Sequence, residues 1–130
     1  MNESIRYNLD FGNTGQRGVF DYDDDFNKNI SHYINVLGLH DFVSKNGLDY
    51  AISENNSNTS GGEKQKIAIL RVLCKDKMVM TFDEPSSASD TRSIREFFSY
   101  LQRIKREKVI IVITHDEIAK RWCDVVIEIA

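Results

Sequence analysis

Apolar residues recur every three or four positions through the first half of the chain, a spacing typical of helices with one buried face. This periodicity predicts helices over residues 30–37, 39–45 and 63–75. Gly38 and the pair Asn46-Gly47 follow the first two helices and supply stops. The polar stretches 10–28 and 54–60 lack the pattern and are predicted to be loops. We therefore expect a helical N-terminal half.

The second half changes to unbroken apolar runs of strand length, at 78–82 and 109–113. Such runs are typical of strands that are covered on both faces. Between them, residues 94–104 follow an amphipathic helical pattern. A short helix over 117–122 and a last strand over 125–129 complete a β-α-β-α-β series. This alternation predicts an α/β half with a parallel sheet and right-handed crossovers.

Composition and charge exclude several classes of protein. At 130 residues and 41% hydrophobic composition, the chain is long enough for one domain with a real core. A net charge of −3 argues against a nucleic-acid or anionic-membrane surface. No apolar run approaches the ~20 residues of a membrane span, and the N-terminus lacks a signal pattern. Cys74 and Cys123 have no metal-ligand spacing, so we expect reduced core thiols in the cytosol. The acidic cluster at 21–25 does not match a calcium loop.

Polar residues that suit phosphoryl transfer follow both predicted strands. Asp83 and Glu84 end the first run, and Thr114-His115 end the second. Ligands of open parallel sheets gather beyond the carboxyl ends of the strands, so these groups should share one edge. One carboxylate can hold Mg²⁺ through water, a second can deprotonate a water, and an imidazole can meet a γ-phosphate. Taken singly, the acidic pair is also explained as loop solvation, and His115 as a structural histidine.

The sequence Ser60-Gly61-Gly62-Glu63 precedes the apolar face of the third predicted helix and has two interpretations. Serine followed three residues later by glutamate is a capping box, which needs no ligand. The same geometry can bind an anion, because the glycines let a ligand approach the backbone N–H groups at the positive end of the helix dipole. These four residues alone leave both interpretations open.

Together these motifs resemble the ATP-binding-cassette (ABC) ATPases. The stretch TSGGEKQK at 59–66 resembles their signature LSGGQ and its basic-Gln-basic triplet, with Thr59 and Glu63 as departures. Residues 78–84 resemble the Walker B strand with its glutamate. Residues 87–90 resemble the D-loop, and His115 in ITHD resembles the switch histidine.

The resemblance extends upstream and implies a fold. Residues 4–12 (SIRYNLDFG) and 34–63 resemble exporter-type cassettes. The implied fold class is α/β, with the C-terminal part of a P-loop NTPase-like (RecA-like) parallel sheet preceded by the ABC helical subdomain. In this division, 1–75 is the helical subdomain with the signature, and 76–130 is the part of the ATPase core with Walker B, D-loop and H-loop.

The resemblance also implies an activity, ATP hydrolysis that drives export, with ATP and Mg²⁺ as cofactors. Asp83 would hold Mg²⁺ through water, Glu84 would be the general base, and His115 would contact the γ-phosphate. Four residues would bind the nucleotide of the opposing subunit in a head-to-tail dimer: Ser60, Gly61, Gly62 and Glu63. Ser87 and Asp90 would lie at the dimer interface. The implied partners are a second nucleotide-binding domain and transmembrane domains, which would place the chain at the cytoplasmic face of a membrane.

One expected element does not occur in the sequence. No G-x-x-x-x-G-K-[ST] motif is found, so the loop that cradles a nucleotide's own phosphates is expected to be missing. The chain alone should then bind ATP poorly, be inactive, and expose apolar strand faces and edges that favour association with itself or a complementary segment.

Three interpretations follow from the missing motif. The chain is a truncated or split part of an exporter ATPase. Alternatively, it is a catalytically incomplete module that presents its signature face to an intact cassette. The third interpretation is a non-transport ABC ATPase. The negative net charge and the lack of coiled-coil heptads argue against it.

Overall fold

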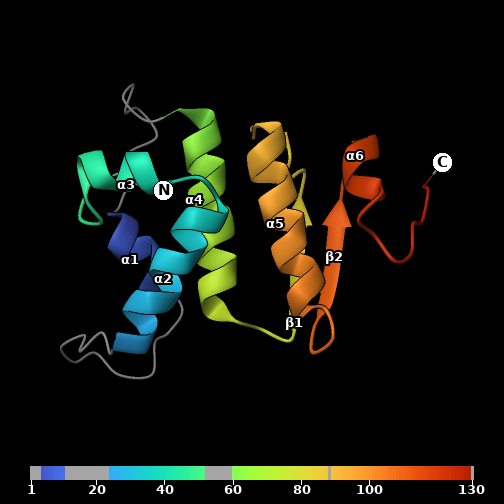
Figure 1. Cartoon of the computed structure of the whole chain (residues 1–130), viewed down its shortest axis with the longest axis horizontal. Helices are drawn as coiled ribbons and strands as arrows, with labels where there is room; N and C mark the ends of the chain where they lie inside the picture. The colour runs from blue at the N-terminus through green and yellow to red at the C-terminus, as the bar shows by residue number, and fades with distance from the viewer. Residues whose placement is uncertain (1–3, 11–23, 52–59, 88, 130) are drawn as a thin grey trace.

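A computed structural model of the chain describes residues 4–10, 24–51, 60–87 and 89–129. Helices dominate the first half, and strands alternate with helices in the second (Figure 1). The elements are α1 (Ile5–Asp10), α2 (Asp24–Val36), α3 (His40–Asn46), α4 (Gly61–Lys75), β1 (Val79–Asp83), α5 (Thr91–Ile104), β2 (Val109–Ile113) and α6 (Glu117–Lys120).

The first four helices pack together on one side of the molecule (Figure 1). Helix α4 contacts both α1 and α2, and its fully buried side chains are Ile67, Leu70 and Leu73. These positions are the apolar face that the periodicity predicted, so the helix is confirmed, although it begins at Gly61 rather than at 63. The predicted short helix at 39–45 is confirmed as α3.

Helix α2 corrects one boundary. The sequence pattern assigned 10–28 to a loop, but the helix already begins at Asp24. The acidic and amide residues at 21–29 favour a loop, but Phe26 stands four residues before Ile30, in register with the apolar face of the helix. The stop at Gly38 is confirmed, with a positive φ of 68° that glycine adopts without strain. Residues 11–23 and 52–59, which include Thr59, most of the predicted loop at 54–60 and part of the acidic cluster, lie outside the described residues.

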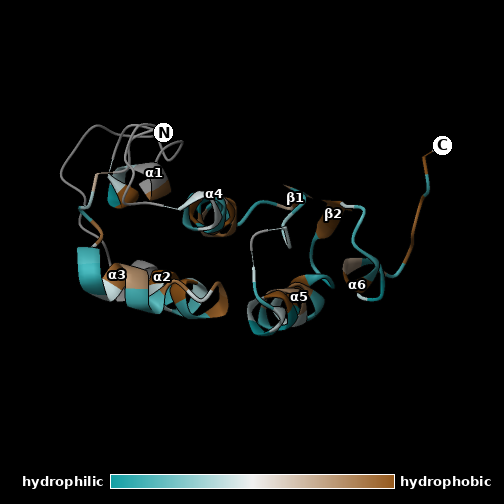
Figure 2. Cartoon of the chain, turned by 90° about the horizontal axis from the view of Figure 1, so that it is seen from above, coloured by the Kyte–Doolittle hydropathy of each residue, from teal (hydrophilic) through white to brown (hydrophobic). Residues whose placement is uncertain are grey.

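The α/β half confirms the predicted parallel pairing. Strand β1 pairs with β2 in parallel, with Val79 opposite Val109 and Asp83 opposite Ile113. Helix α5 connects the two strands and lies over one face of the sheet (Figure 2). Phe97 of α5 packs edge-on against Phe82 of β1, with ring centroids 5.3 Å apart.

The other face of the sheet is uncovered, so the expectation of strands covered on both faces was wrong for the described residues. Helices α5 and α6 lie on the same side of the sheet, and no described element covers the opposite side (Figure 2). The outward-facing aliphatic residues of the sheet are about half exposed: Val79, Val109, Ile111 and Ile113. The exposure of apolar strand faces that the sequence predicted is therefore present in the described residues.

The predicted third strand at 125–129 is also wrong. The sheet of the described residues contains β1 and β2 alone, and Ile127 and Ile129 are 83% and 94% exposed. After α6 the chain turns away from β2 (Figure 1), so its backbone groups do not reach the sheet edge. An apolar run forms a strand only where a neighbour accepts its hydrogen bonds, and none lies beside it here.

Three further expectations concern thiols, metals and membranes. Cys74 and Cys123 are free and half-buried, and burial raises the pKa of Cys74 to about 12. The described residues include no cluster of three or more histidine, cysteine or acidic side chains able to hold a metal ion. None of the helices in the described ranges is long and apolar enough to cross a membrane.

Candidate active site

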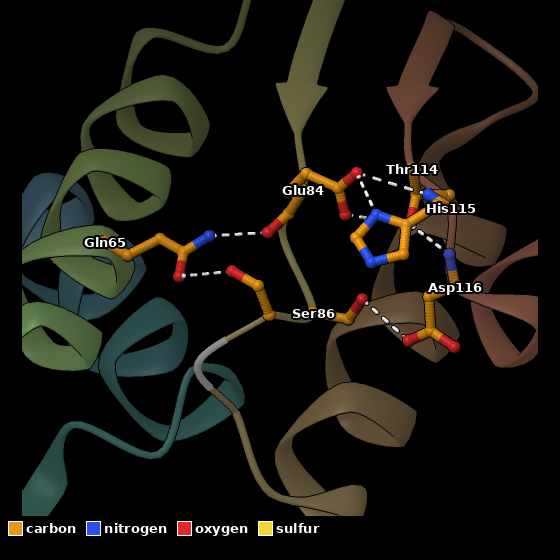
Figure 3. A network of polar contacts seen from close by, with 7 residues as sticks. Gln65, Glu84, Ser86, Thr114, His115 and Asp116 are labelled. Atoms are coloured by element: carbon orange, nitrogen blue, oxygen red, sulfur yellow. Dashed lines mark hydrogen bonds and ion pairs between the residues drawn. The ribbon is translucent and has the colours of Figure 1, made fainter.

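The carboxyl ends of the two strands bring together the acid and the histidine that the sequence singled out. Glu84 follows β1 directly, and His115 comes two residues after β2. His115 Nδ1 lies 2.7 Å from Glu84 Oε1, and the His115 backbone N–H donates to the same oxygen at 3.2 Å (Figure 3). Thr114 Oγ1 donates to Glu84 Oε2 at 3.3 Å. The expectation that these groups share one edge of the sheet is confirmed.

The contacts of Glu84 affect the ionisation of its carboxylate. The hydrogen bond from His115 lowers the pKa of Glu84 below its usual value, and partial burial opposes this effect. The same contacts therefore favour the ionised form of the Glu84 carboxylate. The His115 side chain is 90% exposed, which leaves the imidazole accessible to a ligand.

The backbone of Glu84 is held in an unusual conformation. Its φ is +47°, in the left-handed region that side-chain-bearing residues rarely occupy. The Glu84 N–H donates to the Ile113 carbonyl at 2.7 Å, which ties it to β2. The Glu84 carbonyl accepts a hydrogen bond from Gln65 Nε2 of α4 at 2.5 Å (Figure 3). Such strain is common at functional sites and persists only where neighbouring contacts impose it.

Gln65 was not singled out by the sequence analysis. Its side-chain oxygen also accepts a hydrogen bond from Ser87 Oγ at 3.2 Å. Helix α4 thereby contacts the loop after β1 at two points. The available signal was the position of Gln65 between Lys64 and Lys66 in the basic-Gln-basic triplet.

A second polar pair that the sequence analysis missed fixes the other side of the loop. Buried Ser86 donates to Asp116 Oδ2 at 2.8 Å (Figure 3). Asp116 Oδ1 caps α6 by accepting the Ile118 N–H at 2.9 Å. These bonds, first that of Ile118 and then that of Ser86, lower the pKa of Asp116. The loop that carries Glu84 is thus held from both α4 and α6.

Asp83 differs from Glu84 in having no side-chain hydrogen bond with the residues that the structure describes. It ends β1, is exposed, and lies on the uncovered face of the sheet. Mg²⁺ in phosphoryl-transfer sites keeps several waters and takes one or two carboxylates together with substrate phosphates. A single accessible carboxylate at a strand end fits that coordination.

The four residues at the start of α4 form a capping box. Glu63 N–H donates to Ser60 Oγ at 3.1 Å, and Ser60 N–H donates to Glu63 Oε2 at 2.8 Å. The capping interpretation is therefore confirmed. It leaves room for a ligand, because among the described residues no atom beyond the chain neighbours and the backbone of α4 itself lies within 4 Å of where a Cβ on Gly61 would be. The N-terminus of α4 lies at the same end of the molecule as the strand ends (Figure 1).

The residues expected in the D-loop have local partners. The Ser87 hydroxyl contacts Gln65, as described above. Asp90 is the N-cap of α5 and accepts the Ser93 N–H at 2.8 Å, a bond that lowers the pKa of Asp90. Ala88, between them, lies outside the described residues.

The comparisons with known proteins agree with this arrangement. The family described as "ABC transporter" matches residues 2–87, about two thirds of the chain. The chain belongs to the ABC transporter family. Its N-terminal helices, glycine-containing cap and strand-end acid all lie within the matched stretch.

The similar proteins include a flippase, a putative export protein and a solved exporter. An ATP-dependent lipid A-core flippase of Vibrio parahaemolyticus serotype O3:K6 is 39% identical over 88 residues, 66% of this chain and 15% of the flippase. A putative export ATP-binding/permease protein of Rickettsia felis is 35% identical over 114 residues, 86% of this chain and 18% of that protein. A solved bacterial Atm1-family ABC exporter with ATP bound superposes with a TM-score of 0.70 and 27% identity, covering 92% of this chain and 20% of that one. The chain therefore spans less than a fifth of the length of these two curated relatives.

Proposed function

We propose that this chain supplies the signature helix, the Mg²⁺-binding aspartate, the general base and the phosphate-contacting histidine of an ATP-hydrolysing domain that drives export. The observation that carries the proposal is the 2.7 Å contact between Glu84 and His115 at the ends of parallel strands. Membership of the ABC transporter family supports ATP as the substrate.

The chemistry assigned to the pair is deprotonation of an attacking water. Glu84 Oε2 has one hydrogen bond from a described residue, the long contact to Thr114, so it can still accept a proton from water. The water oxygen would bond to the γ-phosphorus as the bond to the bridging oxygen breaks, and ADP would leave with that oxygen. The exposed His115 ring would meet the γ-phosphate.

Asp83 would hold Mg²⁺ through a water molecule, and the ion would neutralise charge on the phosphates. The accessible carboxylate of Asp83 supports this role. Glu84 itself is engaged by His115 and Thr114, which supports separate tasks for the two acids.

The start of α4 is assigned to the nucleotide of an opposing subunit. Ser60, Gly61, Gly62 and Glu63 would contact its phosphates in a head-to-tail dimer, with Ser87 and Asp90 at the same interface. The N–H groups at the helix N-terminus and the open space at Gly61 support this role. In the same scheme residues 1–75 are the helical subdomain and 76–130 the C-terminal part of the ATPase core. The whole protein would join transmembrane domains at the cytoplasmic face of a membrane.

A second candidate is a binding module without turnover, which offers its signature face to an intact cassette. Two observations favour it. The sequence contains no P-loop motif, and the Glu63 carboxylate occupies the Ser60 N–H that an anion would use.

Hydrolysis by a fusion protein separates the two candidates. A P-loop-bearing segment of an intact ABC cassette is joined ahead of Met1, and Mg-ATP turnover is measured beside a Glu84→Gln variant. We expect turnover in the fusion and a loss of about 10²–10⁴-fold in the variant, the usual contribution of a general base. The unfused chain and its Glu84→Gln variant should both remain at background.

The matched control is Glu96→Gln, which changes an exposed carboxylate paired with Arg92 and should leave turnover unchanged. A fusion that binds ATP but does not hydrolyse it would support the binding module. Equal turnover by the fusion and its Glu84→Gln variant would refute the role of Glu84 as the base.

A further inference from the structure

Gln65 joins the helix that begins at the glycine pair to the backbone of the candidate base. It lies four residues after Gly61, about 6 Å along the helix axis. Its Nε2 donates to the Glu84 carbonyl at 2.5 Å, and its Oε1 accepts from Ser87 Oγ at 3.2 Å. These partners are 19 and 22 residues further along the chain, so a single side chain bridges α4 and the loop after β1.

The conformation at Glu84 needs such a contact. A left-handed φ brings the Cβ of an L-residue too close to the backbone, so the chain tends to leave this region unless it is held. The Glu84 N–H is held by the Ile113 carbonyl, and the Glu84 carbonyl by Gln65. With both ends of the residue fixed, its side chain is directed at His115 (Figure 3).

We propose that Gln65 is a positioning residue that holds the left-handed backbone of Glu84 and so keeps the Glu84 carboxylate against His115. The backbone part stands on geometry alone. The consequence for hydrolysis rests on the proposed function, in which Glu84 is the base.

The same contact would link two nucleotide sites. In the proposed dimer the start of α4 touches the nucleotide of the opposing subunit, whereas Glu84 serves the nucleotide of its own subunit. A displacement of α4 would move Gln65 and with it the Glu84 carbonyl. Closure of the nucleotide site of the opposing subunit would therefore change the position of Glu84 in this subunit.

The first test is structural and uses the chain itself. Gln65→Glu is nearly isosteric and can still accept from Ser87, but it cannot donate to the Glu84 carbonyl. A strong NOE between the amide proton and Hα of the same residue marks a positive φ, and it is measured at Glu84 by NMR. We expect this NOE in the wild-type chain and its loss in Gln65→Glu and in Gln65→Ala.

Gln102→Ala is the matched control. Gln102 Nε2 donates to the Trp122 carbonyl, so the variant loses a bond of the same kind elsewhere in the fold. Its Glu84 NOE should persist. The inference is overturned if the NOE at Glu84 persists in Gln65→Glu. If Gln65→Ala does not fold, the isosteric variant decides the question.

The second test uses the fusion protein. Gln65→Glu should lower kcat by about tenfold or more while the Kd for Mg-ATP stays within about twofold, because misplacing a catalytic group costs rate rather than affinity. An unchanged kcat overturns the link to catalysis. A fusion that is inactive even with Gln65 in place refutes the proposed function instead, and the NMR result still decides the backbone claim.

Discussion

The close packing of the end of α2 against α5 depends on the absence of a side chain at Gly38. This residue ends α2 with φ +68°, and a Cβ built on it would lie 2.8 Å from Ser93 Oγ of α5. That distance is shorter than real Cβ contacts allow, and Ser93 is buried, so its hydroxyl has little room to move. Gly38→Ala therefore combines backbone strain with a steric clash.

Gly47 provides a matched position with the strain alone. Its φ is +78°, and beyond its chain neighbours a Cβ there would meet no atom of the described residues within 4 Å. Alanine in a left-handed conformation destabilises the folded state by about 1–2 kcal/mol. Alanine also lowers the conformational entropy of the unfolded chain, which offsets about 0.4–1 kcal/mol of that loss. Gly47→Ala should therefore destabilise by about 1 kcal/mol. Overpacking costs typically about 1–3 kcal/mol more, so Gly38→Ala should destabilise by about 2–4 kcal/mol.

Urea unfolding followed by circular dichroism measures both variants. In thermal unfolding of a chain of 130 residues, each kcal/mol of destabilisation should lower the melting temperature by roughly 3–5 °C. In a Ser93→Ala background the clash is relieved, so the cost of Gly38→Ala should fall to that of Gly47→Ala. Equal destabilisation by the two glycine variants in the wild-type background would refute the close approach of α2 and α5.

Three further expectations concern caps, thiols and acid stability. Ser60→Ala should cost about 1 kcal/mol in urea unfolding because it removes the cap of α4, whereas Glu63→Gln should cost little since glutamine also serves the capping box; equal losses would contradict this account. Cys74 should react with a disulfide reagent at pH 8 about 100-fold or more slowly than in the urea-unfolded chain, since its pKa of about 12 leaves little thiolate; mass spectrometry would locate the modified thiol. The lowered pKa of Asp116 contributes stability that is fully present above the unfolded value near 4 and is lost as pH falls below it. The stability difference between wild type and Ser86→Ala should accordingly shrink below pH 4 in acid titrations of unfolding, and a difference that does not depend on pH would refute this link.

Elements that depend on local pattern were predictable from the sequence. Helix α5 follows from its apolar positions at helical spacing, and β1 and β2 from their continuous apolar runs. The meeting of Glu84 and His115 followed from one topological rule, that parallel strands end at the same edge. Neither inference required knowledge of which side chains pack against which.

The features that the sequence did not show depend on neighbours in space. The apolar run at 125–129 has strand composition, but its backbone finds no partner. The contacts of Gln65 and Ser86 join residues 19 to 30 positions apart, and polar side chains carry no periodic signal for such partners. The positive φ of Glu84 is likewise set by contacts at both ends of the residue.

The uncovered sheet face and the missing phosphate loop are connected by the pleat of β1. Side chains alternate along a strand, so Asp83 lies on the same face as Val79, whereas Met80 and Phe82 are buried on the face under α5. Any segment that brings phosphates to Asp83 from the uncovered side would also cover Val79, Ile111 and Ile113. Completing the burial of each half-exposed aliphatic side chain is worth on the order of 1 kcal/mol. Formation of the nucleotide site and completion of the hydrophobic core are therefore expected to occur together, so that one covering segment would supply both affinity for ATP and stability.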